Sequence, residues 1–311
     1  MRITNGMAMN GYLRNMNKSM SSMVKLQDQM ASTKRLNKLS DDPVAAVGVM
    51  RYRNKLNMSA QYKENVEKGL TWLQQTESSM MELNGVLKTA YETAIQSSND
   101  FFSPEDKEAA AALIGQLRDH VITIGNAKSG TKFIFGGYNT NKAPFAVDAS
   151  GNILYNGLDM TDTTNADLIA ESGVSIEYEM GFNLQINVSA NGTELLGMGD
   201  NNIYKILDDM YNALKSDASA DELSGFADKI LAGQTRVLSS VTDIGGRVNR
   251  LELISNRYDE DELMYTDLKS KLEDVDQAEA IMNFKMAEFV YNATLQIGSS
   301  IIQPSLADFL K

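Results

Sequence analysis

Apolar residues recur at steps of three and four along most of this 311-residue chain, a spacing that predicts long amphipathic helices. The first such helix is predicted from about Met7 to Leu36. Its apolar stripe is dominated by methionine and comprises Met9, Leu13, Met16, Met20, Met23 and Met30. Thioether side chains fill irregular gaps and re-pack readily. The stripe therefore fits either an ordinary core face or an adaptable assembly surface, and the pattern alone leaves both open.

The stretch LNKLSDDPVAA, residues 36–46, interrupts this pattern. Pro43 disfavours a helical conformation at the residue before it and suits the first turn of a new helix. Asp42 is then a suitable N-cap, accepting a hydrogen bond from the backbone of Val44 or Ala45. A metal site is disfavoured here because no third acidic ligand lies nearby. We predict a hinge and helix cap formed by Ser40, Asp41, Asp42 and Pro43.

Two more helices are predicted before the helical pattern ends. The second covers residues 43–98, a length typical of a coiled coil or a helical bundle. Its buried face is predicted at Val66, Leu70, Leu73, Met80, Leu83, Leu87, Tyr91 and Ala94. The third covers residues 104–129 and begins behind a capping box formed by Ser103 and Asp106. Gly130 is expected to end it as a left-handed C-cap.

Between residues 132 and 197 the period changes to the alternation of short β-strands, punctuated by Gly, Asn and Asp. Helices resume with residues 202–216, whose apolar face is predicted at Ile203, Ile206, Leu207, Met210 and Leu214. A last long helical region opens at a capping box formed by Ser219 and Glu222 and carries its stripe toward the C-terminus. The final residues are markedly apolar and include Ile301, Ile302, Leu306, Phe309 and Leu310.

This order predicts a mainly α fold with a small β-rich insertion, in which both chain ends form a long antiparallel helical bundle or coiled coil. An amphipathic helix cannot bury its stripe alone, so the first and last helices are expected to pack on each other. Their charges agree: residues 34–55 hold six basic and two acidic residues, a net of +4, and residues 259–279 hold nine acidic and two basic, a net of −7. Three parts are expected, namely a terminal assembly domain (1–40 plus 276–311), a helical body (41–139 plus 196–275) and an outer insertion (140–195).

Composition removes several classes of function. The net charge of −12 and a pI near 4.7 argue against general nucleic-acid binding. The absence of cysteine excludes disulfides, thiolate nucleophiles and Cys-based zinc sites. The lone histidine, His120, is expected at the solvent edge of a helix. No P-loop, dinucleotide-binding or hydrolase motif occurs, so we predict no enzyme, no cofactor and no metal. No apolar run could span a membrane, and the N-terminus has no apolar signal segment.

Three motifs resemble one known family. KLQDQMASTKRLNKLSDDPVAA (residues 25–46) resembles the N-terminal motif of the hook-associated protein 3 family, within the flagellin superfamily. NAKSGTKFIFGGYNT (126–140) resembles the Gly-Gly turn of that family, and residues 272–311 resemble its C-terminal signature. Two departures lie at the hinge. Thr33 stands where the family tends to have glycine, and Leu39 where proline or alanine is usual.

By this resemblance the chain is expected to form a ring at the junction between the first hook-associated protein, on the hook side, and the flagellin filament. The implied partners are flagellin, the first hook-associated protein, further copies of the chain and a cytosolic export chaperone. The resemblance implies export through the flagellar type III channel without a cleaved signal and an extracellular location in the flagellum. Charge and hydropathy predict no nucleic-acid partner and no membrane insertion. A flagellin-type filament subunit is the alternative within the superfamily. An intracellular coiled-coil scaffold is the alternative from another class, although it leaves the β-rich insertion unexplained.

The terminal helices are where assembly is expected. We predict that both are poorly ordered in the free subunit and become ordered when neighbours bury their stripes. The predicted assembly interface comprises Met9, Leu13, Met16, Met20, Met23, Met30, Met282, Met286, Phe289, Leu295, Ile302, Leu306 and Phe309. The predicted chaperone contacts are Ile281, Phe284, Phe289, Ile301 and Leu310.

Overall fold

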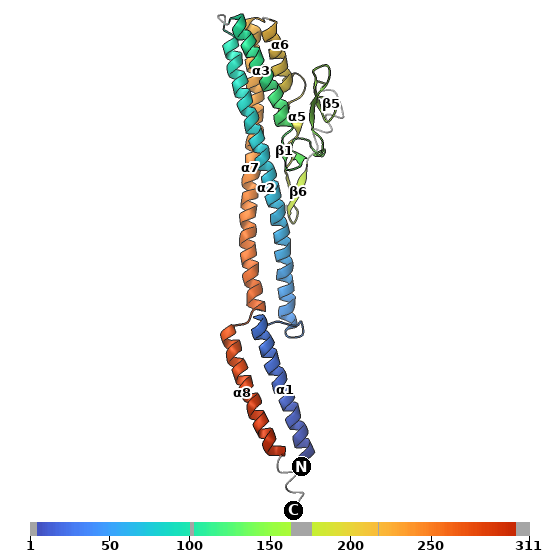
Figure 1. Ribbon diagram of the computed structural model, residues 1–311, viewed down its shortest axis with the longest axis vertical. Helices are drawn as coiled ribbons and strands as arrows, with labels where there is room; N and C mark the ends of the chain where they lie inside the picture. The colour runs from blue at the N-terminus through green and yellow to red at the C-terminus, as the bar shows by residue number, and fades with distance from the viewer. Residues whose placement is uncertain (1–4, 100–102, 163–175, 217, 303–311) are drawn as a thin grey trace, which may run out of the picture. The chain divides into compact units, whose positions relative to one another are not determined.

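The computed structural model describes residues 5–99, 103–162, 176–216 and 218–302. Its contacts divide into two compact units: unit 1 comprises Met1–Ser59 and Glu260–Lys311, and unit 2 comprises Ala60–Asp259. The fold is mainly α, with long antiparallel helices, and the strands of the described residues all lie in unit 2 (Figure 1). The predicted fold class is therefore confirmed.

The helices are α1 (Asn5–Ser32), α2 (Pro43–Ser97), α3 (Pro104–Gly125), α5 (Gly192–Leu196), α6 (Ile203–Lys215), α7 (Ala220–Glu273) and α8 (Gln277–Ile302), with a short 3-10 helix η1 (Gly199–Asn201). The strands are β1 (Lys128–Ser129), β2 (Lys132–Phe133), β3 (Phe145–Val147), β4 (Ile153–Tyr155), β5 (Leu158–Asp159), β6 (Glu177–Gly181) and β7 (Leu184–Asn187). All strand pairs are antiparallel, in the orders β1-β2, β3-β4-β5 and β6-β7. Helices α2 and α7 contribute residues to both units.

Local sequence signals explain how two helices of unit 2 begin. Ser103 and Asp106 form a complete capping box at the start of α3. Ser219 Oγ accepts a hydrogen bond from the backbone nitrogen of Glu222 at 3.3 Å, at the start of α7. Each cap satisfies an amide that the first turn of a helix leaves without a partner. The helices therefore begin where the sequence predicted.

The predicted end of the third helix is wrong. Helix α3 ends at Gly125 rather than near Ser129, because β1 and β2 pair as a tight hairpin with Lys128 opposite Phe133. Gly130 does have a positive φ, of 61°, but it lies in the turn of this hairpin and is not a helix cap. Strand pairing has replaced the last helical turn.

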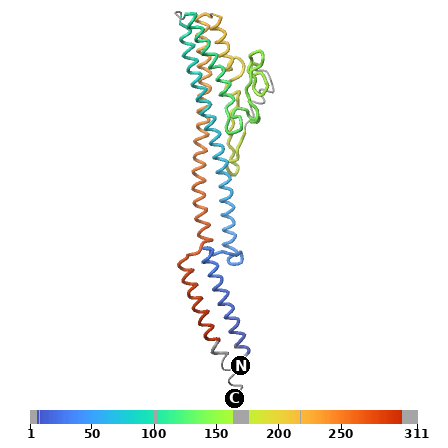
Figure 2. The backbone as a smooth tube through the Cα atoms, viewed as in Figure 1, coloured from blue at the N-terminus to red at the C-terminus, as the bar shows by residue number. Residues whose placement is uncertain are grey.

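In unit 2, α2 and α7 lie side by side and run in opposite directions (Figures 1 and 2). The Tyr62 and Tyr258 rings are 6.1 Å apart between centroids, and Gln234 Nε2 donates to Asn84 Oδ1 at 3.1 Å. The face of α2 predicted to be buried is buried or half-buried throughout, at Val66, Leu70, Leu73, Met80, Leu83, Leu87, Tyr91 and Ala94. The core of unit 2 therefore follows the helical period of the sequence.

Helix α6 adds a further layer by packing on α3. Arg118 of α3 donates from Nη1 to Asp208 Oδ1 at 2.6 Å, and Gly115 leaves room for the Tyr211 ring, 3.3 Å from where a Cβ would stand. The apolar face predicted for α6 is fully buried, at Ile203, Ile206, Leu207, Met210 and Leu214.

The strands lie beside these helices in unit 2 (Figure 1). The β6–β7 hairpin is tied to both long helices: Asn65 Nδ2 of α2 donates to the Glu179 carbonyl at 2.9 Å, and the Tyr258 hydroxyl of α7 donates to the Met180 carbonyl. Tyr155 of β4 is fully buried and donates to the Phe135 carbonyl at 2.9 Å. These bonds give three backbone carbonyls a side-chain donor, and the carbonyl of Phe135 is a buried one.

Candidate assembly surface and the paired helix breaks

In unit 1, α1 and α8 lie side by side in antiparallel orientation (Figure 2). The Tyr12 ring of α1 lies directly against Gly298 of α8, where a Cβ would come within 2.0 Å of the Tyr12 hydroxyl oxygen. The half-buried seam of α1 advances by alternating steps of four and three through Tyr12, Met16, Ser19, Met23, Leu26 and Met30. The first and last helices therefore pack on each other, as their stripes indicated.

The structure divides the predicted apolar stripe of α1 into two groups. Met9, Met16, Met23 and Met30, which repeat every seven residues, are half-buried. Leu13 and Met20 are 42% and 47% exposed, next to Met7 and Val24, which are also exposed. The seam with α8 instead uses Tyr12 and Ser19, each one residue before Leu13 or Met20. A second apolar edge of α1 is therefore left uncovered in the single chain.

Most of the large apolar residues of helix α8 are exposed. Phe284 is half-buried, whereas the exposed apolar residues include Ile281, Met282, Met286, Phe289, Val290, Leu295 and Ile297. Phe289 is the extreme case, with 73% of its surface exposed. Where the burial of α1 and α8 residues is described, only Ala280 and Gly298 are buried. The α1–α8 pair therefore has almost no enclosed core of its own.

The remaining predicted contacts lie at the end of the chain. Ile301 and Ile302 belong to the last turn of α8, but their side chains are outside the described part of the structure. Leu306, Phe309 and Leu310 lie outside the described residues altogether.

The segment between α1 and α2 is an ordered turn. Pro43 is the first residue of α2, and Asp42 Oδ1 accepts a hydrogen bond from the Ala45 backbone nitrogen at 3.0 Å. Ser40 is exposed and makes no side-chain hydrogen bond to any described residue. Asp42 therefore acts as the N-cap of α2.

Asp41 holds the turn from the other side. Its Oδ2 accepts hydrogen bonds from the backbone nitrogens of Lys38 at 3.0 Å and Asn37 at 3.3 Å, and its Oδ1 pairs with Lys25 Nζ at 3.0 Å. The hydrogen bond from Lys25, followed by that from the Lys38 backbone, lowers the pKa of Asp41 below its ordinary value. The turn is thus joined to α1 by an ion pair.

A second helix break interrupts what the sequence pattern predicted as one continuous helical region. Helix α7 ends at Glu273 and α8 begins at Gln277. Asp276 caps α8, accepting at Oδ1 from the backbone nitrogens of Ala278 at 2.9 Å and Glu279 at 3.2 Å. No glycine or proline marks this break, and the apolar spacing continues across it. The sequence pattern therefore did not predict it.

The two breaks are bonded to each other. Lys34 and Asp274 form an isolated antiparallel bridge, the Arg35 backbone nitrogen donates to the Glu273 carbonyl at 2.8 Å, and the Val275 nitrogen donates to the Thr33 carbonyl at 3.1 Å. Because residues 33–35 are engaged in this pairing, α1 ends at Ser32 and not near Leu36 as predicted. We term residues 33–42 together with 273–276 the joint.

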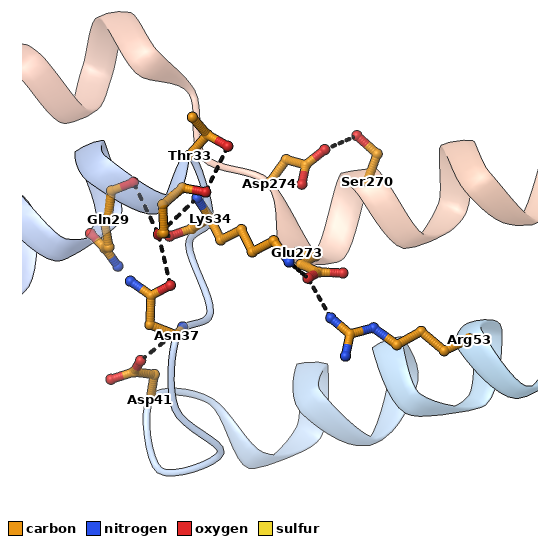
Figure 3. Close-up of polar contacts among 10 residues, drawn as sticks. Gln29, Thr33, Lys34, Asn37, Asp41, Arg53, Ser270, Glu273 and Asp274 are labelled. Carbon is orange, nitrogen blue, oxygen red and sulfur yellow. Dashed lines mark hydrogen bonds and ion pairs between the residues drawn. The ribbon is translucent and has the colours of Figure 1, made fainter.

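Glu273 is the central side chain of the joint (Figure 3). Its residue surface is 3% exposed, and its Oε1 accepts from both Lys34 Nζ and Arg53 Nη2 at 2.6 Å. Burial by itself would raise the pKa of Glu273, but the hydrogen bonds from Lys34 and Arg53 outweigh it and leave the pKa below its ordinary value. One carboxylate therefore ties α7 to the start of the joint and to α2.

A small pocket lies next to this ion pair, with a volume of about 140 Å³. It is lined by Leu36, Asn37, Lys38, Leu39, Ala46, Val49, Met50, Arg53 and Glu273. Small-molecule sites usually enclose about 300–1,000 Å³. The size of the pocket and the mutual pairing of its charges indicate a structural role for the joint.

The described residues contain no group of three or more His, Asp or Glu side chains arranged to hold a metal ion. His120 is exposed and forms a surface pair with Glu82, Nε2 to Oε1 at 3.0 Å. Within the described ranges, no helix has the length and apolar character needed to cross a membrane.

Two residues of the joint escaped the sequence analysis. Glu273 belongs to the acidic segment 259–279, but nothing in its neighbours distinguishes it from the exposed acids there. Thr33 has a φ of 57°, a left-handed conformation that a β-branched residue rarely adopts. The one available signal was that threonine stands where the resembling family tends to have glycine.

Comparisons with known proteins find flagellins and hook-associated protein 3. A family model described as the bacterial flagellin N-terminal helical region matches residues 3–140. The chain is 25% identical to flagellar hook-associated protein 3 of Escherichia coli K12, covering 94% of this chain and 95% of that protein. It is 24% identical to a flagellin of Halalkalibacterium halodurans, covering 92% and 90%. The crystal structure of the flagellar junction protein FlgL from Legionella pneumophila has the same fold, with a TM-score of 0.59 at 15% identity over 74% of this chain and 100% of that one. These matches confirm the resemblance inferred from the three motifs.

Proposed function

We propose that the chain is a structural protein of the bacterial flagellum that forms the junction between hook and filament, because it resembles hook-associated protein 3 over nearly its whole length. The match to the E. coli protein extends over nearly the whole of both chains, so it includes the β-rich insertion as well as the shared helical ends. The observation that carries the proposal is the apolar surface that α1 and α8 leave uncovered.

We propose that residues 1–40 and 276–311 form the assembly domain of this junction. Its partners are the first hook-associated protein on one side, flagellin on the other, and further copies of the chain within a ring. Export through the flagellar type III channel places it outside the cell. Before export, the apolar face of the C-terminal helix is covered by a cytosolic chaperone through Ile281, Phe284, Phe289, Ile301 and Leu310.

The packing of unit 1 supports assembly through these ends. Fixing the backbone of each residue costs about 1–2 kcal/mol, and this has to be offset by burial. The α1–α8 pair offers little enclosed surface for that purpose, whereas the helices of unit 2 enclose a continuous core. We therefore expect α1 and α8 to be marginal in the free subunit and to gain their order when neighbouring subunits cover Leu13, Met20 and Phe289.

Co-sedimentation tests the partners directly. The purified full-length chain is mixed with polymerised flagellin and, separately, with the first hook-associated protein. We expect it to pellet with flagellin and to bind the hook-side protein, and we expect the Phe289→Asp variant to bind less to one or both. A matched control is Leu253→Asp, because Leu253 is equally exposed, at 70%, but lies in unit 2. Absence of binding to both partners would refute the junction role.

Limited proteolysis tests the order of the ends. With a protease at low concentration, we expect cleavage within residues 5–32 and 277–302 well before cleavage within residues 60–97. Mass spectrometry of the fragments identifies the sites. Equal resistance of the ends and the middle of the chain would show that the terminal helices are already folded in the monomer.

The chaperone proposal is tested by removing the last apolar residues of the chain. Deletion of residues 301–311 should reduce export into the medium, because part of the chaperone-binding surface is lost. Export and cytosolic solubility equal to those of the full chain would contradict it.

A flagellin-type filament subunit is a second candidate, since the chain also matches the Halalkalibacterium halodurans flagellin over nearly its full length. A filament subunit would form long filaments from the purified chain alone, whereas a junction protein would not. In flagella, a junction protein would be present in far fewer copies than flagellin. An intracellular coiled-coil scaffold would be found in the cytosol and absent from sheared flagella.

A further inference from the structure

The start of α2 presents an exposed apolar stripe that carries positive charge. Its residues are exposed and lie on the side of the helix away from its buried residues; they are Val44, Val47, Met50, Arg51 and Met58, termed here the basic face. Val44 is 84% exposed and Val47 is 56% exposed. Residues 43–59 contain three basic residues and no acidic one. Arg51 makes no ion pair with any residue that the structure describes.

The end of α7 presents a stripe of similar width and opposite charge. It consists of Glu260, Leu263, Met264 and Asp267, termed here the acidic face. Leu263 is 73% exposed and Met264 is 47% exposed. Residues 260–267 contain four acidic residues and no basic one. Asp267 is paired with Lys271 on its own helix at 2.7 Å, whereas Glu260 has no ion pair among the described residues.

One molecule cannot bring its own two faces together. Within unit 1, α2 and α7 contact each other through other residues: the Tyr52 and Tyr265 rings stack at 6.3 Å, and Gly48 lies against Leu272. At about 100° per residue, Val47 lies about 100–140° around its helix from Gly48 and Tyr52, and Leu263 lies about 160–180° around its helix from Tyr265 and Leu272. The two faces therefore lie outside the contact that α2 and α7 make within one chain.

We propose that the basic face of one copy docks on the acidic face of a second copy. This inference rests on the proposed junction function and specifies the contact between neighbouring copies in the ring. Exposed valine, leucine and methionine side chains on both faces would bury each other, and Arg51 of one copy would approach Glu260 of the next. Opposite charge around an apolar centre selects this pairing and disfavours contact between two basic faces.

The geometry determines the kind of assembly. Because two different surfaces meet, the contact is head-to-tail, and each copy that joins leaves one free face of each kind. Repetition of such a contact gives a closed ring when the rotation between copies closes, and an open helical array when it does not. A self-complementary dimer would instead use one face twice.

Introduced cysteines test this contact sharply, because the chain has none of its own. Flagella are sheared from cells that produce the Val47→Cys, Leu263→Cys double variant and are treated with a short thiol cross-linker. We expect a ladder of cross-linked multimers from the double variant and no multimers from either single variant. A double variant with cysteines at Val47 and Tyr138 is the control; Tyr138 is 72% exposed in unit 2 and should give no ladder.

Charge reversal gives an independent reading of the same contact. In the cysteine background, Arg51→Glu or Glu260→Arg should lower the ladder yield about two- to fivefold, the range expected for a rim ion pair. Combining both reversals should restore the yield, whereas Lys88→Glu, an exposed site in unit 2, should leave it unchanged.

The outcomes separate this inference from the proposed function. If the double variant is incorporated into flagella, the cells swim and no ladder forms, the docking of the two faces is refuted while the junction role stands. A dimer from Val47→Cys alone, or an equal ladder from the control pair, also refutes it. If the unmodified chain itself is absent from sheared flagella, the proposed function fails first.

Discussion

Replacing Glu273 by glutamine tests the physical account of the joint. In the native chain its carboxylate receives Lys34 Nζ and Arg53 Nη2, both at 2.6 Å, and its side chain is 4% exposed. Each hydrogen bond to a charged group contributes about 1.5–3 kcal/mol, and stranding a fully buried charge costs about 3–5 kcal/mol. Lys34 and Arg53 are about half exposed, so water re-solvates them once the carboxylate is neutral. We therefore expect a loss of about 1.5–3 kcal/mol at the joint, below the range for a stranded charge.

Amide hydrogen exchange measures this loss where it occurs. The amides to follow are those of Arg35 and Val275, because both donate across the joint. If they exchange through local opening, the variant should exchange about 10- to 100-fold faster at these two positions. Glu252→Gln, at an exposed site on the same helix α7, is the matched control and should change exchange little. Unchanged exchange at Arg35 and Val275 in the Glu273→Gln variant would refute the role assigned to the carboxylate.

The same residue predicts a dependence on pH. The pKa of Glu273 in the folded chain lies below its ordinary value of 4.5, so the ionised carboxylate stabilises the fold. This contribution is fully present above the ordinary pKa and is lost as the pH falls through the lowered one. Opening of the joint should therefore increase progressively below about pH 4.5, and the glutamine variant should show a shallower dependence. The variant keeps some dependence because the pKa of Asp41 is also lowered.

Three other substitutions have expected effects of known sign. Thr33→Gly should stabilise the joint by about 0.5–1.5 kcal/mol, because a φ of 57° strains a β-branched residue, and faster exchange near residue 33 would contradict this. Asp42→Ala should destabilise the start of α2 by about 1 kcal/mol by removing the acceptor of the Ala45 amide, and Asp42→Asn should recover most of the loss in a denaturant titration. Gly192→Ala should destabilise unit 2 by about 1–3 kcal/mol, since its Cβ would stand 2.4 Å from the Tyr155 ring; an unchanged melting temperature would refute that packing.

The stripe of α1 shows what apolar periodicity predicts correctly and what it does not predict. Steps of three and four identified the helix and the heptad positions Met16 and Met23, which do lie in the seam with α8. The same steps also admitted Leu13 and Met20, which the structure leaves exposed. An apolar stripe can be one residue wider than the seam it serves, and only the position of the partner helix selects which edge is covered.

The two helix breaks show a similar division. The break before Pro43 was predictable because proline and an N-cap aspartate act through local backbone geometry. The break at residues 274–276 lacks proline and glycine, and it is accompanied by backbone pairing with Thr33 and Lys34, more than 200 residues away. A contact of that sequence separation leaves no local signature.

The sequence by itself determined the helices, most of their caps, the buried faces of α2 and α6, and the family resemblance, because these depend on neighbours within a few residues along the chain. Only the tertiary structure decided which acid of the C-terminal segment becomes the buried partner of Lys34 and Arg53, and which apolar residues of α1 and α8 remain uncovered. Burial is a property of what lies opposite a side chain in space. For Glu273 and Phe289 that neighbour, or its absence, comes from a distant part of the chain.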